Sequence, residues 1–401
     1  MFRASARGPV AGLAVVATAA LVLSGCSASK VLKSDGGSSS DASPVAKTFE
    51  GSISMNVRRG ATGVKVDQHV KVKASGAQLQ SVNLKGPGGT VPGTLATDSS
   101  HWKATGLLRP ASKYVVTGVA VGDNGVRKQF KRSFHTQKLT LDQQTYPSFS
   151  PVAGATVGIA MPVIVRFDVP VTDKAGIQKH LEVTSQPAQA GSWHWISDNE
   201  VHWRPKKFWK AGTKVTVKAD IGGVPAGNGI YGQLDRQETF TIGRAQVLKV
   251  DTRSDEMHVV RDGKTIRTIP VTTGKQPEYT TRSGIKVIVE KDRRHDMNSE
   301  TIGIDPNSAD GYNLKGVEYA MRLTYSGEFL HAAPWSVASQ GHANVSHGCT
   351  GMSTANAGWL YNNSLIGDPV IYTGTNRQMT LTNGLGDWNE SFAEYAKGSA
   401  L

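Results

Sequence analysis

The sequence predicts a mainly β protein built from two β-sandwich domains followed by a third β-rich domain. Short runs of alternating apolar and polar residues recur along the chain, glycine reaches 44 residues, and continuous amphipathic helical patterns are scarce. At 401 residues the chain is too long for a single core, since one domain typically takes about 150 residues. The hydrophobic content of 38% and charged content of 19% fit folded domains rather than disorder or a multi-span membrane protein.

Residues 1–25 predict a lipoprotein signal peptide. Arg3 and Arg7 precede an apolar stretch, and Leu23-Ser24-Gly25-Cys26 follows it directly. This ending resembles the lipobox of bacterial lipoproteins, which implies that Cys26 is diacylated and becomes the first mature residue. An ordinary cleaved signal and an uncleaved anchor are the alternatives. Residues 26–45, rich in Gly and Ser, predict a flexible tether that holds the folded part at the outer face of the cell membrane.

Residues 46–138 and 139–243 predict the two sandwiches. Alternating runs at Ser52–Val57 and Val64–Val66 indicate strands in the first, and Val163–Phe167 and Val215–Lys218 indicate strands in the second. A weak repeat relates the two, because the pattern around Trp102 returns around Trp203.

Aromatic residues concentrate between Gly191 and Pro205. A carbohydrate-stacking face is one interpretation of this segment. Core packing is the commoner use of tryptophan, and we favour it.

Residues 244–374 predict the third domain. Asp262-Gly263 between two alternating runs, Met257–Arg261 and Thr265–Ile269, is a strong signal for a β-hairpin with a two-residue turn. Further strands are predicted at Ile285–Val289, Tyr319–Tyr325 and Val370–Tyr372, and a helix with Ser353 as N-cap is predicted to run through Tyr361. Residues 375–401 form a C-terminal extension expected to pack on the third domain or on a sandwich.

Charge and cysteine usage narrow the function. The net charge is +13, or +11 without Arg3 and Arg7, which favours polyanionic partners. The sequence has no nucleic-acid motif, so anionic lipid head groups and wall polymers are better candidates than nucleic acid. The chain has 2 cysteines, and if Cys26 is lipidated then Cys349 has no partner for a structural disulfide.

Three histidines, His331, His342 and His347, lie within twenty residues of Cys349. A thiol becomes a nucleophile as the thiolate, which a nearby histidine can generate by accepting the proton. If residues 346–349 are extended, His347 and Cys349 share a face, and a returning strand ending at His331 would bring that imidazole beside the sulfur.

Two other interpretations compete with catalysis. Three histidines and a cysteine can bind zinc, although the spacing matches no familiar zinc site. A buried, inert cysteine is about as well supported by these residues alone as catalysis is.

The segment resembles the signature of the L,D-transpeptidases, in which a His is followed after a gap by Ser/Thr-His-Gly-Cys. Fourteen residues separate His331 from Ser346, as that pattern allows. The C-terminal Gly384–Asn389 resembles the actinobacterial branch, in which Ig-like domains precede the catalytic domain. The resemblance covers about Tyr146 to the C-terminus, with a looser match before it. It implies two Ig-like sandwiches and a β-rich catalytic domain with the cysteine at the mouth of a tunnel under a loop.

The resemblance also implies roles for individual residues. Cys349 corresponds to the nucleophile and His331 to the base, while the main-chain N–H groups of His347, Gly348 and Cys349 form the oxyanion site. The remaining positions are implied to contact substrate or to form the lid and wall: Tyr312, Ser326, Gly327, Met297, Trp335 and Ser346. One position departs from the family, because Gly351 stands where the family usually has Asn.

The implied reaction is acyl transfer on the tetrapeptide stems of peptidoglycan without a metal or cofactor. Cys349 would form a thioester with the donor stem, and the amine of an acceptor stem would resolve it to give a 3→3 cross-link. Water as acceptor would make the protein an L,D-carboxypeptidase, and a degenerate, non-catalytic wall-binding lipoprotein is a third reading. The resemblance further implies inhibition by carbapenem β-lactams.

Overall fold

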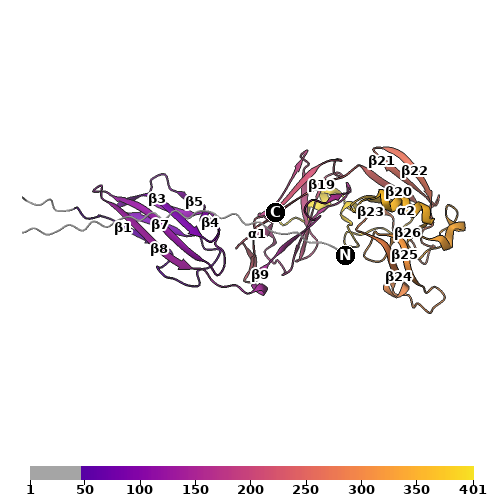
Figure 1. Cartoon of the computed structure of the whole chain (residues 1–401), viewed down its shortest axis with the longest axis horizontal. Helices are drawn as coiled ribbons and strands as arrows, with labels where there is room; N and C mark the ends of the chain where they lie inside the picture. Colours follow the sequence, from indigo (N-terminus) through magenta and orange to yellow (C-terminus); the bar gives the residue numbers. More distant parts are fainter. Residues whose placement is uncertain (1–46) are drawn as a thin grey trace, which may run out of the picture. The chain divides into compact units, whose positions relative to one another are not determined.

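The computed structural model describes residues 47–401 (Figure 1). The predicted signal peptide, Cys26 and the whole of the predicted tether lie outside these residues. Strands dominate the described part, so the prediction of a mainly β protein is confirmed. None of its helices is both long and apolar enough to cross a membrane.

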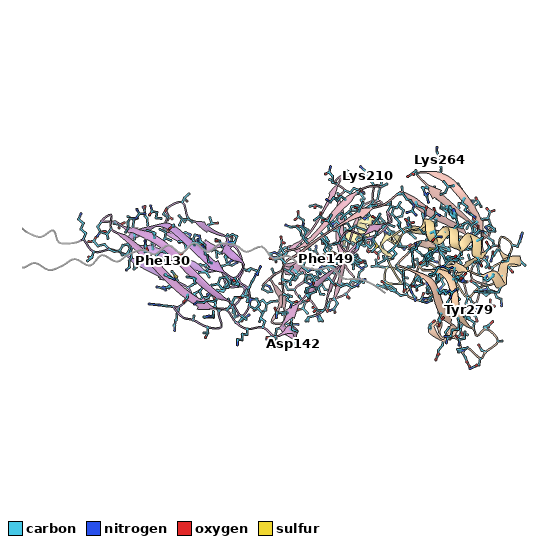
Figure 2. All side chains as sticks on the ribbon, in the orientation of Figure 1. Phe130, Asp142, Phe149, Lys210, Lys264 and Tyr279 are labelled. Carbon is cyan, nitrogen blue, oxygen red and sulfur yellow. The ribbon has the colours of Figure 1, made fainter. Side chains whose placement is uncertain are left out.

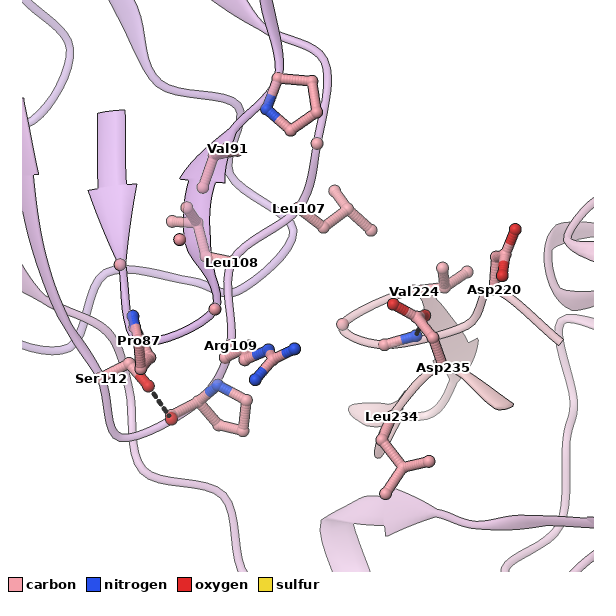
Figure 3. A pocket seen from close by; sticks show the side chains of 18 of the residues that line it. Pro87, Val91, Leu107, Leu108, Arg109, Ser112, Asp220, Val224, Leu234 and Asp235 are labelled. Atoms are coloured by element: carbon pink, nitrogen blue, oxygen red, sulfur yellow. Dashed lines mark hydrogen bonds between the residues drawn. The ribbon is translucent and has the colours of Figure 1, made fainter. Parts of the chain in front are cut away.

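The first sandwich consists of two four-stranded sheets with strand orders β1-β2-β6-β5 and β4-β3-β7-β8. Apolar side chains of both sheets, including Leu84, Trp102 and Phe134, pack between them. Figure 3 shows the turn that leads into β7, where the Ser112 hydroxyl donates to the Pro110 carbonyl at 2.8 Å. The strands are β1 Ser52–Met55, β2 Lys71–Ser75, β3 Ala77–Gly86, β4 Gly89–Val91, β5 Gly93–Leu95, β6 His101–Ala104, β7 Lys113–Gly122 and β8 Arg127–His135.

The strand predicted at Val64–Val66 is wrong. Val64 makes only an isolated bridge to Thr136. Val64 and Val66 are both buried, so their alternation with Lys65 reflects packing of a loop against the core rather than membership of a sheet.

The second sandwich has sheets in the orders β10-β12-β15-β14 and β11-β19-β16-β13, with a small sheet β17-β18-β9 beside them. The predicted strands coincide with β12 and fall within β16. The elements are η1 Leu141–Gln143, β9 Gln144–Thr145, β10 Pro147–Ser150, β11 Thr156–Val157, β12 Val163–Phe167, α1 Lys174–Gln178, β13 Leu181–Gln186, β14 Gly191–Trp195, β15 Glu200–Pro205, β16 Lys214–Ala219, β17 Pro225–Gly227, β18 Ile230–Gly232 and β19 Arg236–Ile242.

The tryptophans of the aromatic segment are core residues. Trp193, Trp195 and Trp203 are at most 9% exposed and belong to one apolar cluster with Trp209.

The repeat seen in the sequence has a structural basis. A Cβ on Gly191 would collide with the Trp203 ring of the paired strand, and a Cβ on Gly93 would collide with the Trp102 ring in the same way. Each sandwich thus uses a glycine to make room for one tryptophan.

The third domain combines a five-stranded sheet, β22-β21-β20-β28-β23, with a four-stranded sheet, β24-β25-β26-β27. Helix α2 contacts the second of these sheets through β25 and β26. The elements are β20 Gln246–Asp251, β21 Glu256–Arg261, β22 Lys264–Pro270, β23 Gly284–Val287, β24 Glu290–Asn298, η2 Ser299–Ile302, β25 Asn313–Arg322, β26 Phe329–Ala332, η3 Pro334–Ser339, β27 Thr350–Met352, α2 Thr354–Asn363 and β28 Pro369–Thr373.

Local signals in this domain were informative at turns and caps. Asp262 and Gly263 have φ values of 49° and 78°, as a type I′ hairpin turn requires, and they connect β21 to β22. The Ser353 side chain accepts a hydrogen bond from Asn356 N and caps α2. The bounds of two predicted strands were wrong, because β23 ends at Val287 instead of Val289, and β25 spans Asn313–Arg322 instead of Tyr319–Tyr325.

The C-terminal extension contains η4 Asp387–Asn389 and α3 Phe392–Ala396. Trp388 donates its indole N–H to Ala160 of the second sandwich at 2.8 Å, and Asn389 donates to Ile285 of the third domain at 2.7 Å. The chain ends beside α1, where Ala400 N donates to Gln178 at 2.9 Å (Figure 1). The extension therefore contacts both domains.

Candidate functional site

A cavity of about 330 Å³ lies on the third domain and is lined by Cys349, His331 and His347, but not by His342. Most of the side chains that the sequence singled out line it. The lining residues are Thr272, Met297, Tyr312, Leu314, His331, Ala333, Trp335, Ser336, Val345, Ser346, His347, Cys349 and Gly351.

Parallel pairing of β26 with β27 brings the two halves of the motif together. His331 lies opposite Gly351 in this ladder, and the intervening segment crosses over through η3. The strand expected to end near His331 is present as β26 Phe329–Ala332, and it runs parallel to β27. The condition that residues 346–349 are extended is not met, because Gly348 has φ of +125° and turns the chain before β27.

The His331 imidazole is buried, with 6% of the residue exposed. Its Nδ1 lies 2.8 Å from the Ala332 carbonyl, which can only accept, so Nδ1 carries the proton and Nε2 is left with a free lone pair. Burial lowers the pKa of His331. The ring stacks on Trp335 with centroids 5.8 Å apart. His331 is therefore a neutral imidazole of fixed orientation at neutral pH.

The Cys349 thiol is partly buried and donates to the Gly327 carbonyl at 3.4 Å. Burial raises the pKa of this thiol to about 11. The resting cysteine is consequently a thiol at neutral pH, and it needs a base to become a nucleophile.

Hydrogen bonds shape the loop before the nucleophile. The Gly348 N–H donates to Ser346 Oγ at 3.1 Å, and that hydroxyl donates to the Cys349 carbonyl at 2.6 Å. Thr281 holds the Gly348 carbonyl at 2.9 Å. The Gly348 amide is thus already engaged, which differs from the expectation that it binds an oxyanion. No acceptor for the amides of His347 and Cys349 is found within residues 47–401.

His347 lies between two tyrosines rather than beside the sulfur on a strand. Its ring centroid is 4.5 Å from that of Tyr279 and 5.0 Å from that of Tyr312. Figure 2 labels Tyr279 on the third domain. Sequence reasoning missed Tyr279, which sits in a loop with no recognisable motif. Burial, and then the nearby sulfur of Cys349, raise the pKa of Tyr312 to about 12, so it remains a neutral hydroxyl.

Ser326 and Gly327 do not line the cavity with the other predicted residues. Gly327 contributes its carbonyl to the thiol, whereas Ser326 bonds to Asn383 of the C-terminal extension through both its amide and its hydroxyl, each at 2.9 Å. The extension therefore holds the loop whose Gly327 carbonyl accepts the hydrogen bond from the thiol.

Gly351 is enclosed on the His331 side. A Cβ at this position would lie 2.8 Å from the Ala333 Cβ and 3.2 Å from Thr272 Cγ2. Its amide and carbonyl both bond to Thr272 at 2.9 Å. Because Gly351 is not among the glycines of positive φ in the described chain, close packing rather than backbone conformation explains the glycine.

A buried ionic cluster lies near the thiol, and no sequence pattern predicted it. Glu328 pairs with Lys286 at 2.5 Å and with Arg282 at 3.0 Å, and Lys286 is fully buried against the Tyr372 ring. Burial lowers the pKa of Lys286 to about 8, although Glu328 opposes this effect.

In residues 47–401, no group of three or more His, Cys, Asp or Glu residues has the geometry of a metal site.

Comparison with known proteins identifies the family. A bacterial Ig domain family matches residues 61–225, and the L,D-transpeptidase catalytic domain family matches residues 245–371. L,D-transpeptidase 2 of Mycobacterium tuberculosis is 34% identical over 359 residues, which cover 89% of this chain and 87% of that protein. The chain belongs to the L,D-transpeptidase family.

Other members of the family agree with this assignment. L,D-transpeptidase 5 of M. tuberculosis is 35% identical over 340 residues, covering 83% of this chain and 73% of that protein. The solved structure of an LD transpeptidase in complex with imipenem has a TM-score of 0.50 and 37% identity, and it covers 58% of this chain and 99% of its own. The protein is thus an L,D-transpeptidase with Ig-like sandwiches before its catalytic domain, as its sequence predicted.

Proposed function

We propose that this L,D-transpeptidase forms 3→3 cross-links between peptidoglycan stems through a thioester on Cys349. The placement of His331 supports this most directly: its Nδ1 is fixed by the Ala332 carbonyl at 2.8 Å, so the free Nε2 is available inside the cavity that Cys349 lines. A thiol whose pKa is about 11 needs such a base.

In the first half-reaction, His331 Nε2 accepts the thiol proton while sulfur attacks the carbonyl of the third residue of a donor tetrapeptide. The amides of His347 and Cys349 stabilise the resulting oxyanion. Collapse breaks the C–N bond, the terminal D-Ala leaves with the proton from His331, and a thioester remains.

In the second half-reaction, the side-chain amine of an acceptor stem attacks the thioester. His331 takes the amine proton and returns it to sulfur as the C–S bond breaks. The cross-link and the free thiol are the products. If water is the acceptor, the same steps give L,D-carboxypeptidase activity.

Substitution of Cys349 and His331 tests this proposal. The chain spanning residues 27–401 would be incubated with tetrapeptide fragments, and mass spectrometry would measure dimers and D-Ala release. Cys349→Ala should abolish both products without unfolding, and His331→Gln should slow them by about 10²–10⁴. His342→Gln, which changes an exposed histidine of the same segment, is the matched control.

Other results of the same assay would identify one of the alternative functions. D-Ala release without dimers would assign the carboxypeptidase activity, and binding without either product would assign the non-catalytic wall-binding role. A carbapenem should form one adduct per chain, because a relative is known as an imipenem complex. An adduct that persists in Cys349→Ala would show that another residue is the nucleophile.

The anchoring proposal has its own test. The lipobox-like ending at Cys26 implies an extracytoplasmic protein held by an acyl chain, and Cys26→Ser removes the acceptor of that chain. In detergent-phase partitioning of cells that produce the full chain, wild type should enter the detergent phase and Cys26→Ser should not. Equal partitioning of the two proteins would exclude the acyl anchor.

A further inference from the structure

The net positive charge of the protein comes almost entirely from the first Ig-like domain. Residues 47–138 contain 15 Lys and Arg but 4 Asp and Glu, which gives a net charge of +11, whereas residues 139–401 contain 26 of each. A charge that served solubility alone would have no reason to be confined to one domain.

Within this domain the charge is arranged on the strands. The eight strands β1–β8 contain 9 Lys and Arg and no Asp or Glu, so all four acidic residues of the domain lie outside them. Every ion pair found among residues 47–401 joins residues from Arg166 onward. Among residues 47–401, the Lys and Arg side chains of the first domain therefore form no ion pair with an acidic side chain.

The first sheet carries a row of lysines on its outer face. Lys71 lies directly opposite Lys103, and Lys73 lies opposite His101, while their buried neighbours Val72 and Trp102 point into the core. Like charges that face each other across an antiparallel pair destabilise a sheet. A row of this kind is expected where an external anion supplies the missing charge.

The second sheet is cationic on its outer face as well. Lys85, Lys113 and Lys131 are exposed, and they alternate along their strands with core residues such as Leu84, Tyr114 and Phe134. The two outer faces of a sandwich point in opposite directions. A flat bilayer can reach one of them at a time, whereas a flexible linear polymer can follow both.

We propose that the first Ig-like domain binds a linear polyanion of the cell envelope along the outer faces of both sheets. Lysine suits this task, because its ammonium group is a point charge on a flexible stem and pairs with repeated anionic groups without a fixed geometry. Such binding would hold the catalytic domain within the wall independently of its reaction.

The test measures binding of the chain spanning residues 27–401, which lacks the predicted signal peptide, to long-chain inorganic polyphosphate by isothermal titration at several salt concentrations. Affinity should fall steeply as salt increases, because binding releases counterions. The variant Lys71→Ser/Lys73→Ser/Lys103→Ser and the variant Lys85→Ser/Lys113→Ser/Lys131→Ser should each lose about tenfold in affinity and bind with a shallower salt dependence.

The matched control changes three exposed lysines of the second domain, Lys206→Ser/Lys207→Ser/Lys210→Ser, and should change affinity less than threefold, as expected for remote charges. Circular dichroism melting should show that the first variant is at least as stable as wild type, because it removes a like-charge pair. Turnover of small stem peptides should stay unchanged in all three variants.

Three outcomes would overturn the proposal. The first is absence of binding to polyphosphate, and the second is an equal loss in the second-domain control. The third is binding to vesicles of phosphatidylglycerol and phosphatidylcholine that is lost in only one of the two first-domain variants. That result would assign a single membrane-facing surface instead.

Discussion

Among residues 47–401, one buried ionic cluster lies between the second sandwich and the C-terminal extension, and another lies near Cys349. In the first, His202 Nδ1 lies 2.8 Å from Asp387 and its Nε2 lies 2.7 Å from Glu200, so two carboxylates share one imidazole. In the second, Lys286 and Arg282 share the single carboxylate of Glu328.

The pKa values respond in opposite directions. Burial opposes the charged form of His202, but its two carboxylates outweigh burial and raise its pKa to about 9. For Lys286 burial outweighs the carboxylate and lowers the pKa to about 8. The two carboxylates around His202 keep its imidazole charged, so it forms ion pairs between the second sandwich and the extension. The two cations that share Glu328 leave a net positive charge near the thiol. We expect the first cluster to control stability and the second to tune reactivity.

The largest effect is expected from Asp387→Asn. Asp387 is fully buried and also accepts from the Tyr395 hydroxyl at 3.0 Å, so the substitution breaks a buried pair and should reduce the free energy of unfolding by about 3–5 kcal/mol. Turnover of the protein that remains folded should not change. Denaturant unfolding measures the first quantity, and initial rates well below the melting temperature measure the second.

This variant also predicts a pH dependence. Since the pKa of His202 is raised from 6.5 to about 9, the stability due to its protonation is complete below about pH 6.5 and is lost as the pH rises through about 9. Asp387→Asn should move this loss to lower pH. Asp198→Asn, which breaks an exposed pair with Lys174, is the control and should change stability by less than about 1 kcal/mol. If Asp387→Asn loses turnover but keeps its stability, the assignment of stability to the first cluster and of reactivity to the second is wrong.

A smaller effect is expected from Gly351→Asn. This variant compares the stability lost by overpacking near the thiol with the stability lost by breaking the ion pair of Asp387. The substitution introduces the residue that the family usually has at this position. The 2.8 Å approach of a Cβ to Ala333 predicts overpacking that lowers stability by about 1–3 kcal/mol and displaces the segment after His331.

Ala333→Gly provides the compensating change. The double variant should recover most of the stability lost in Gly351→Asn, and the non-additivity in a double-mutant cycle measures the contact. If Gly351→Asn alone is as stable as wild type and binds donor peptides more tightly, the packing argument is wrong.

The parts of this fold that sequence predicted are those set by local rules. Asp262-Gly263 predicted its turn because few residues adopt positive φ, and Ser353 predicted its helix start because its hydroxyl caps a free amide. The His331 and Cys349 motif predicted residues that line the cavity because it resembles the family's signature, whereas thiol chemistry alone left an inert cysteine equally well supported.

The parts that sequence missed depend on long-range pairing. Strand β24 reads as charged on both faces, so its pattern shows no buried side. Glu328 and Lys286 look like surface residues until the fold places them together near the thiol. The direction of β26 relative to β27 depends on the crossover between them, which no local signal encodes.

The smallest expected effect concerns Lys286→Met and tests the second cluster directly. Burial is the main cause of the raised pKa of Cys349; Glu328 raises it further, whereas the positive charge of Lys286 lowers it. Methionine occupies a similar volume against the Tyr372 ring, and Glu328 keeps its bond to Arg282 at 3.0 Å, so no carboxylate is left unpaired. The pKa of the thiol should therefore rise, and alkylation of Cys349 by iodoacetamide at a fixed neutral pH should slow several-fold. The full pH profile should move to higher pH, which a loss of packing alone would not cause. Lys249→Met, at an exposed position on β20, should leave the profile unchanged. A profile in Lys286→Met that overlays that of wild type would show that the cluster supports the fold near the thiol without tuning its reactivity.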